Sequence, residues 1–172
     1  KTFESGDVES AWAECKTVLE GTVESGGQEH LYLETQAAIA IPNEGNTFRI
    51  ISSTQSPTAV QRTAARITGL PMHDIEVDVL RLGGAFGGKE DQATHWAVLC
   101  CLGSFITKRP VKLVLNRMED LRMTGKRHPY TSDYKIGLTE DLKIHAFEVK
   151  YYQNAGAVAD LSPAILERTL FH

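Results

Sequence analysis

The feature that most limits how this chain can fold is a cluster of glycines between a predicted strand and a predicted helix. Apolar and polar residues alternate over residues 75–82 (IEVDVLRL), which predicts a half-buried strand. Four glycines follow within residues 83–90 (GGAFGGKE), and the apolar stretch at residues 91–107 then predicts a largely buried helix. Glycine lets the backbone approach a ligand closely or adopt a positive φ. A strand, a glycine loop and a helix in this order therefore indicate a binding site.

Strands and helices alternate irregularly along the rest of the chain. Further strands are predicted over residues 30–41, 47–53, 111–115, 130–138 and 143–152. Helices are predicted where Ala11, Cys15 and Leu19 share a face, from Ser56 to Gly69, over residues 117–122, and from Ser162 onward. Residues 139–141 join the last two strands as a hairpin turn. This pattern favours an α+β (mixed α/β) fold, a sheet with packed helices, over a doubly wound parallel sheet.

Length, charge and cysteine usage narrow the class of protein. The 172 residues correspond to one domain or to a large piece of a bigger protein. Lys and Arg total 18 against 22 Asp and Glu, so the net charge of -4 provides no basic field for nucleic acid or an anionic membrane. The longest apolar run, residues 93–106, is shorter than the ~20 residues of a membrane span. Three cysteines without a C-x-x-C spacing favour a reducing compartment, which we expect to be the cytoplasm.

The glycine loop also resembles nucleotide-binding motifs. Gly83 to Lys89 reads G-x-x-x-x-G-K, which nearly matches a P-loop, but Glu90 stands where a hydroxyl should hold Mg²⁺. The two pairs of adjacent glycines fail the G-x-G-x-x-G spacing of dinucleotide-binding folds. A non-catalytic binding module with a degenerate P-loop-like glycine loop stays open as an alternative.

Several polar and sulfur-containing residues are predicted to be structural. The six histidines lack the spacing of a metal site; they are His30, His73, His95, His128, His145 and His172. Cys100 and Cys101 fall within the predicted apolar helix and are expected to fill the core. The mixed charges of residues 117–127 predict a solvated face.

Several stretches of the sequence occur in an order that is typical of one enzyme family. They are residues 26–34 (GGQEHLYLE), 52–55 (SSTQ), 83–90 (GGAFGGKE), 126–129 (KRHP), 160–162 (DLS) and 166–172 (LERTLFH). These stretches resemble the molybdenum-cofactor domain of xanthine dehydrogenases and oxidases, which are molybdenum hydroxylases. The resemblance implies that residues 1–172 are part of a larger molybdopterin-binding domain. Residues 1–24 would be a lead-in segment, and residues 25–172 the family-like region.

The resemblance also implies an activity, cofactors and partners. The activity is hydroxylation of a purine, hypoxanthine or xanthine, with oxygen from water at a molybdenum-molybdopterin centre. The pterin, rather than side chains, would hold the molybdenum. Iron–sulfur clusters and FAD are expected on domains or subunits outside this chain, and the complete enzyme is expected to be oligomeric. By itself this chain is expected to be inactive, because the general base and the electron-transfer path lie elsewhere. An aldehyde-oxidising member of the same family stays open as an alternative.

Three residues are implied to contact the cofactor. Gln28 corresponds to the glutamine that hydrogen-bonds an oxygen on the molybdenum centre, a role that suits an amide able to donate and accept. Phe86 and Gly87 correspond to loop residues beside the molybdenum ligands. Ala85 departs from the family, because a third glycine is usual at its position.

Two charged residues are implied to be catalytic. Glu90 and Arg168 correspond to the acid and the base that flank the heterocycle in purine-oxidising members, whereas aldehyde oxidases tend to have uncharged residues there. Hydroxylation of a purine carbon places negative charge on the ring, which a guanidinium stabilises by charge-assisted hydrogen bonds. The carboxylate would accept hydrogen bonds from the ring and fix its orientation.

Overall fold

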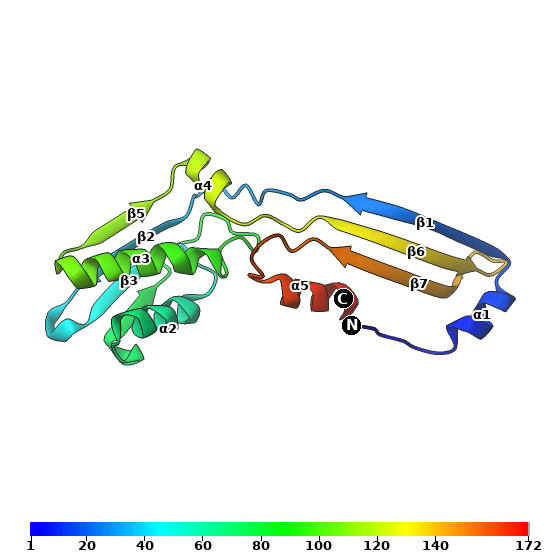
Figure 1. Cartoon of the computed structure of the whole chain (residues 1–172), viewed down its shortest axis with the longest axis horizontal. Coiled ribbons are helices and arrows are strands. Elements are labelled where there is room, and N and C mark those ends of the chain that lie inside the picture. The colour runs from blue at the N-terminus through cyan, green and yellow to red at the C-terminus, as the bar shows by residue number, and fades with distance from the viewer. Residues whose placement is uncertain (172) are drawn as a thin grey trace. The chain divides into compact units, whose positions relative to one another are not determined.

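The computed structural model describes residues 1–171, which form two compact units (Figure 1). One unit is Glu29–Lys126, and the other combines Lys1–Gln28 with the described residues from Arg127 onward. Each unit contains its own sheet and its own helices. Within residues 1–171, no helix combines the length and apolar character needed to cross a lipid bilayer.

A four-stranded sheet and two helices make up most of the unit Glu29–Lys126. The strands are β2 (Ala37–Pro42), β3 (Phe48–Ser52), β4 (Ile75–Asp78) and β5 (Val111–Val114), in the order β4-β3-β2-β5. β3 and β4 are parallel, and the other neighbouring strands are antiparallel. The helices α2 (Pro57–Thr68) and α3 (Gln92–Thr107) pack against each other and against the sheet (Figure 1). Shorter helical elements are η1 (Glu44–Asn46), η2 (Met72–Asp74) and α4 (Arg117–Met123).

The hydrophobic core of this unit lies between the sheet and the two helices. Buried positions alternate along β2 and β3, as expected for strands with one covered face. The buried cluster consists of Ala38, Ala40, Phe48, Ile50, Val60, Ala64, Ala65, Ile75, Ala97, Val98, Cys100 and Cys101. Burial raises the pKa of the Cys101 thiol to about 11. The prediction that Cys100 and Cys101 fill the core is therefore confirmed.

Local sequence signals account for the ends of the helices. α2 has Pro57 in its first turn and ends at Gly69, whose φ of 72° lies in the left-handed region that glycine adopts easily. α4 begins with a capping box, in which the side chains of Asn116 and Glu119 each accept the other's main-chain N–H.

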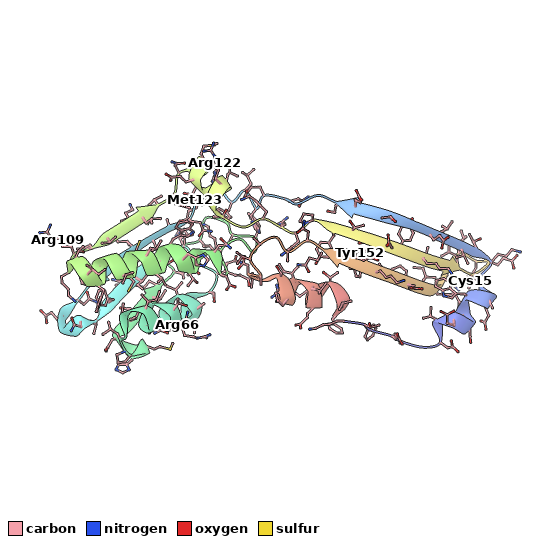
Figure 2. The ribbon with its side chains drawn as sticks, in the orientation of Figure 1. Cys15, Arg66, Arg109, Arg122, Met123 and Tyr152 are labelled. Carbon is pink, nitrogen blue, oxygen red and sulfur yellow. The ribbon has the colours of Figure 1, made fainter. Side chains whose placement is uncertain are left out.

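A three-stranded antiparallel sheet is the centre of the other unit. It contains β1 (Thr17–Ser25), β6 (Tyr130–Leu138) and β7 (Ile144–Gln153), in the order β1-β6-β7. The predicted hairpin turn joins β6 to β7, and the Thr139 N–H donates to the Lys143 carbonyl there. α1 (Val8–Glu14) packs against β7, and α5 (Ser162–Phe171) follows β7 in the chain. Cys15 and Tyr152 lie toward opposite ends of this sheet (Figure 2).

The predicted mixed fold class is confirmed, but three predicted elements are wrong in part. Residues 30–36 are not a strand, because Leu31 has a φ of 47° and β2 begins only at Ala37. Residues 79–82 leave the sheet, because β4 is an edge strand whose pairing with β3 ends at Asp78. Leu19 lies in β1 rather than in a helix, because its strand pairs with β6.

Candidate functional site

The glycine loop, residues 83–90, forms a tight turn with several residues in the left-handed region. Gly84, Phe86 and Gly87 have φ values of 90°, 53° and 91°. Two of these residues are glycines, and the third, Phe86, has 64% of its surface exposed. A Cβ built on Gly87 would meet no atom within 4 Å, so space is open beside its main chain. An exposed turn of this kind can bring main-chain atoms against a ligand.

Two other glycines of the loop leave no space for a side chain. A Cβ on Gly88 would lie 2.8 Å from ring carbons of both His30 and Tyr32. A Cβ on Gly83 would lie 2.5 Å from the Cβ of Glu34. The loop therefore packs directly onto the segment that precedes β2.

Substituting Gly88 tests this close packing. We expect Gly88→Ala to destabilise the protein by about 1–3 kcal/mol, because the added methyl group overlaps two rings that fill space rather than flexible side-chain ends. The midpoint of thermal unfolding measures the change. Gly26→Ala is the matched control, since a Cβ there meets no atom within 4 Å. Equal midpoints for the two variants would contradict the packing argument.

The main chain of the loop is held by two glutamine side chains. Gln55 Oε1 accepts the N–H groups of Gly87 and Lys89, each at 3.2 Å. The main-chain N–H of Gln55 also donates to the Lys89 carbonyl at 2.9 Å. Gln36 Nε2 donates to the Gly88 carbonyl at 2.9 Å. Three consecutive residues of the turn are thus fixed through their main-chain atoms.

The Lys89 side chain is buried beneath the loop in an ion pair. Its Nζ lies 3.1 Å from Glu34 Oε2, 2.7 Å from Ser53 Oγ, and 4.5 Å from the centre of the Tyr32 ring. None of its side-chain surface is exposed. Burial lowers the pKa of Lys89, and the neighbouring Glu34 carboxylate partly offsets that effect. Burial acts to raise the pKa of Glu34, but hydrogen bonds from Ser53, the Gly83 N–H and Lys89 outweigh it and hold that pKa below its usual value.

The burial of Lys89 bears on the nucleotide-binding alternative. In a P-loop the lysine reaches the phosphates of the ligand. Here the Lys89 ammonium is enclosed and already paired with Glu34, so it is unavailable to a phosphate on the surface. The geometry therefore argues against a degenerate P-loop.

A second carboxylate, Asp120, lies in the same network and is fully buried. It accepts hydrogen bonds from the Tyr32 hydroxyl at 2.6 Å and from the Gln36 N–H at 2.7 Å. Burial, together with Asp120, raises the pKa of Tyr32. Arg117 donates to the carbonyls of Tyr32 and Leu33. The prediction that residues 117–127 form a solvated face is therefore wrong at Asp120, which is fully buried.

The predicted site residues fall in both units. Phe86, Gly87 and Glu90 lie together on the glycine loop, and Glu90 is partly buried with no recorded hydrogen bond or ion pair inside residues 1–171. In the other unit, the Gln28 N–H donates to the Arg127 carbonyl at 3.3 Å, and the Arg127 N–H donates to the Gln28 carbonyl at 2.9 Å.

Arg168 is exposed on α5 and has no ion-pair partner in the described part of the chain. His172, the last residue of the resembling stretch 166–172, lies outside the described residues.

Sequence reasoning assigned no role to several residues that hold the loop. Glu34, Gln55 and Lys89 lie inside stretches that carry the family resemblance, but their contacts depend on residues distant in the chain. The sequence presents Lys89 only as the lysine of a P-loop-like stretch, and no local signal indicates its pairing with Glu34.

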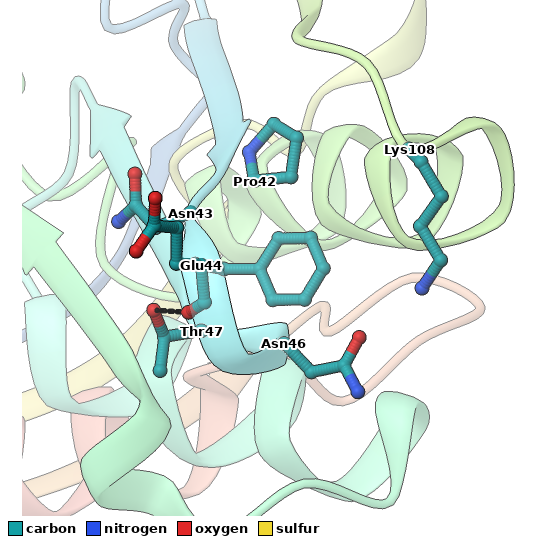
Figure 3. A pocket seen from close by; sticks show the side chains of 7 residues that line it. Pro42, Asn43, Glu44, Asn46, Thr47 and Lys108 are labelled. Carbon is teal, nitrogen blue, oxygen red and sulfur yellow. Dashed lines mark hydrogen bonds between the residues drawn. The ribbon is translucent and has the colours of Figure 1, made fainter.

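Neither a side-chain metal cluster nor the surface hollow beside the turn between β2 and β3 coincides with the predicted site residues. Across residues 1–171, no group of three or more His, Cys, Asp or Glu side chains is placed to hold a metal ion. A hollow beside the turn between β2 and β3 is shown in Figure 3. It is lined by Pro42, Asn43, Glu44, Asn46, Thr47, Phe48 and Lys108. No predicted site residue lines it.

Comparison with known proteins identifies close relatives along the whole chain. Residues 1–172 match the family described as the molybdopterin cofactor-binding domain. Xanthine dehydrogenase from Emericella nidulans is 44% identical over 171 residues, which are 99% of this chain and 12% of that protein. Xanthine dehydrogenase from Drosophila pseudoobscura pseudoobscura is 42% identical and covers 97% of this chain and 12% of its own length. This chain therefore spans about an eighth of the length of these curated relatives.

The fold is also found in a solved structure. Aldehyde oxidoreductase from Desulfovibrio gigas matches with a TM-score of 0.84 at 23% identity, covering 95% of this chain and 18% of that chain. At this identity, the likeness supports the fold alone.

Proposed function

Because the chain belongs to the molybdopterin cofactor-binding domain family of xanthine dehydrogenase-like molybdenum hydroxylases, we propose that it is a segment of a purine-hydroxylating enzyme. The observation that carries this proposal is the exposed turn of the glycine loop, which presents Phe86, Gly87 and Glu90 together. The named relatives support purines as the substrate class.

The turn suits a large cofactor that binds through main-chain contacts. Gly87 combines a left-handed φ with open space where a side chain would lie, so a group can approach its backbone there. Phe86, Gly87 and Gln28 would contact the molybdopterin. When bound, the molybdenum centre supplies the oxygen-transfer and redox chemistry. The protein residues bind and orient the cofactor.

Glu90 and Arg168 are the residues that would bind the purine. Neither side chain has a recorded ion pair within the described residues, so each charge is available to a ligand. The Glu90 carboxylate accepts hydrogen bonds from ring N–H groups and so orients the heterocycle. The Arg168 guanidinium donates to substrate oxygen and stabilises negative charge that develops on the ring.

The rest of the enzyme completes the reaction. The remainder of the molybdenum domain supplies the general base, and iron–sulfur clusters and FAD on other domains or subunits carry electrons away. The complete enzyme is an oligomer in the cytoplasm. Without these parts, residues 1–172 do not turn over substrate.

Aldehyde oxidation is the second candidate function. The family resemblance includes aldehyde-oxidising members, and the Desulfovibrio gigas aldehyde oxidoreductase shares the fold. The charged pair of Glu90 and Arg168 favours a purine, because an aldehyde offers no ring N–H for a carboxylate to bind.

Molybdenum content tests the proposed function. We expect stoichiometric molybdenum, measured by elemental mass spectrometry, in the native polypeptide that carries this segment, purified from its own host. The same protein from molybdenum-depleted cells is the control. An intact preparation from molybdenum-replete cells that contained no molybdenum would contradict the proposal and return attention to a binding module.

A further inference from the structure

We propose that Lys89 is a positioning residue, whose buried ammonium pairs with the partly exposed Glu34 carboxylate, holds the glycine loop closed and so sets where Glu90 lies. This inference rests on the proposed function of Glu90. Lys89 has no exposed side-chain surface, so it acts through the loop rather than by touching a ligand.

One carboxylate oxygen joins the two ends of the loop. Glu34 Oε2 accepts the N–H of Gly83 at 2.8 Å and lies 3.1 Å from Lys89 Nζ. The Ser53 hydroxyl donates to the same oxygen at 2.6 Å and lies 2.7 Å from Lys89 Nζ. The first glycine of the loop and its lysine are therefore held at one point.

The functional side chains of the loop depend on this anchoring. Glu90 has no recorded hydrogen bond or ion pair with residues 1–171, and Phe86 is largely exposed. Their positions follow from the main chain at Lys89, whose N–H and carbonyl are bound by Gln55 and whose side chain is held by Glu34 and Ser53. Any movement of Lys89 is passed directly to Glu90, the next residue.

The charge at Lys89 is better explained by positioning than by stability. Burying a lysine costs desolvation energy, and replacing a buried ion pair with apolar side chains is often neutral or stabilising. An apolar residue would fill the space beside Tyr32, but it would leave the loop ends unconnected. The ion pair instead supplies directional contacts that specify one loop conformation.

Hydrogen exchange in the complete enzyme tests whether Lys89 holds the loop. We expect Lys89→Met to speed amide exchange across residues 83–90 about tenfold, since a charge-assisted contact is lost. Lys112→Met is the matched control, because Lys112 is exposed on β5. In this variant, we expect amide exchange across residues 83–90 to stay unchanged. Ser53→Ala, a milder change at the same point, gives a smaller rise and keeps the test available if Lys89→Met does not fold. Unchanged exchange in both variants would overturn the proposal.

Purine kinetics test whether Lys89 acts through Glu90. We expect Lys89→Met to lower kcat/KM for the purine about 100-fold, as small misplacements of a reacting group do. In a Glu90→Ala background, Lys89→Met then has little further effect, because the positioned group is gone. If the losses in kcat/KM from Lys89→Met and Glu90→Ala multiplied in the double variant, the positioning role would be overturned. If Glu90→Ala alone left purine turnover unchanged, the proposed role of Glu90 would fail, and Lys89 could not act through it. Amide exchange across residues 83–90 would still test whether Lys89 holds the loop.

Discussion

Replacing Glu90 with valine in the complete enzyme is expected to lower purine kcat/KM far more than it lowers aldehyde turnover. The expected loss of transition-state stabilisation on the purine is about 2–4 kcal/mol, the usual effect of removing one oriented hydrogen-bonding group. Glu90 lies at the end of the glycine loop, two residues before α3 begins, and its carboxylate has no hydrogen-bond or ion-pair partner among residues 1–171. Under the proposed role of Glu90, the lost interaction is one made with substrate.

Steady-state kinetics on both substrates measure this difference. Glu76→Val is the matched control, because Glu76 is exposed on the edge strand β4 and valine suits a strand. We expect Glu76→Val to leave both activities unchanged. Equal losses on purine and aldehyde for Glu90→Val would contradict a role in purine binding.

Asp120→Ala produces the largest expected loss of stability. We expect the free energy of unfolding to fall by about 3–5 kcal/mol, because the Tyr32 hydroxyl and the Gln36 N–H both lose a buried charged acceptor. The substitution also removes a negative charge that stabilises the charged form of Lys89. The midpoint of thermal unfolding reports the change.

Two variants act as controls for Asp120→Ala. Asp120→Asn keeps one acceptor oxygen and is expected to cost less. Arg122→Ala changes an exposed residue of the same helix, and it is expected to leave the midpoint almost unchanged (Figure 2). A loss at Asp120 no greater than the loss at Arg122 would show that the buried network contributes little.

Elements with local signals could be predicted from the sequence. α2 follows from the proline in its first turn and the glycine at its end, and the hairpin of β6 and β7 follows from two strand-like runs around a short turn. The loop that carries Phe86, Gly87 and Glu90 was also recognisable, because its glycines are adjacent in the chain.

Features that depend on distant partners could not be predicted. Residues 30–36 contain strand-forming side chains, but contacts with residues of the glycine loop and α4 hold them in another conformation. Asp120 lies in a stretch of mixed charge that is typical of a surface, and its partners are 84 and 88 positions away. Lys89 likewise meets partners 36 and 55 positions earlier in the chain.

Glu34 Oε2, which contacts Gly83, Ser53 and Lys89, limits which substitutions this protein can accept among species. Loss of the lysine alone leaves a carboxylate without its cation, and loss of the glutamate alone leaves a buried cation, so each single change is disfavoured. Simultaneous replacement of both by apolar residues would avoid that charge penalty, although it would also remove the loop contacts made by Glu34, so the two charges are expected to be kept or lost together. Positions 34 and 89 are therefore expected to covary across homologues, although 55 positions separate them.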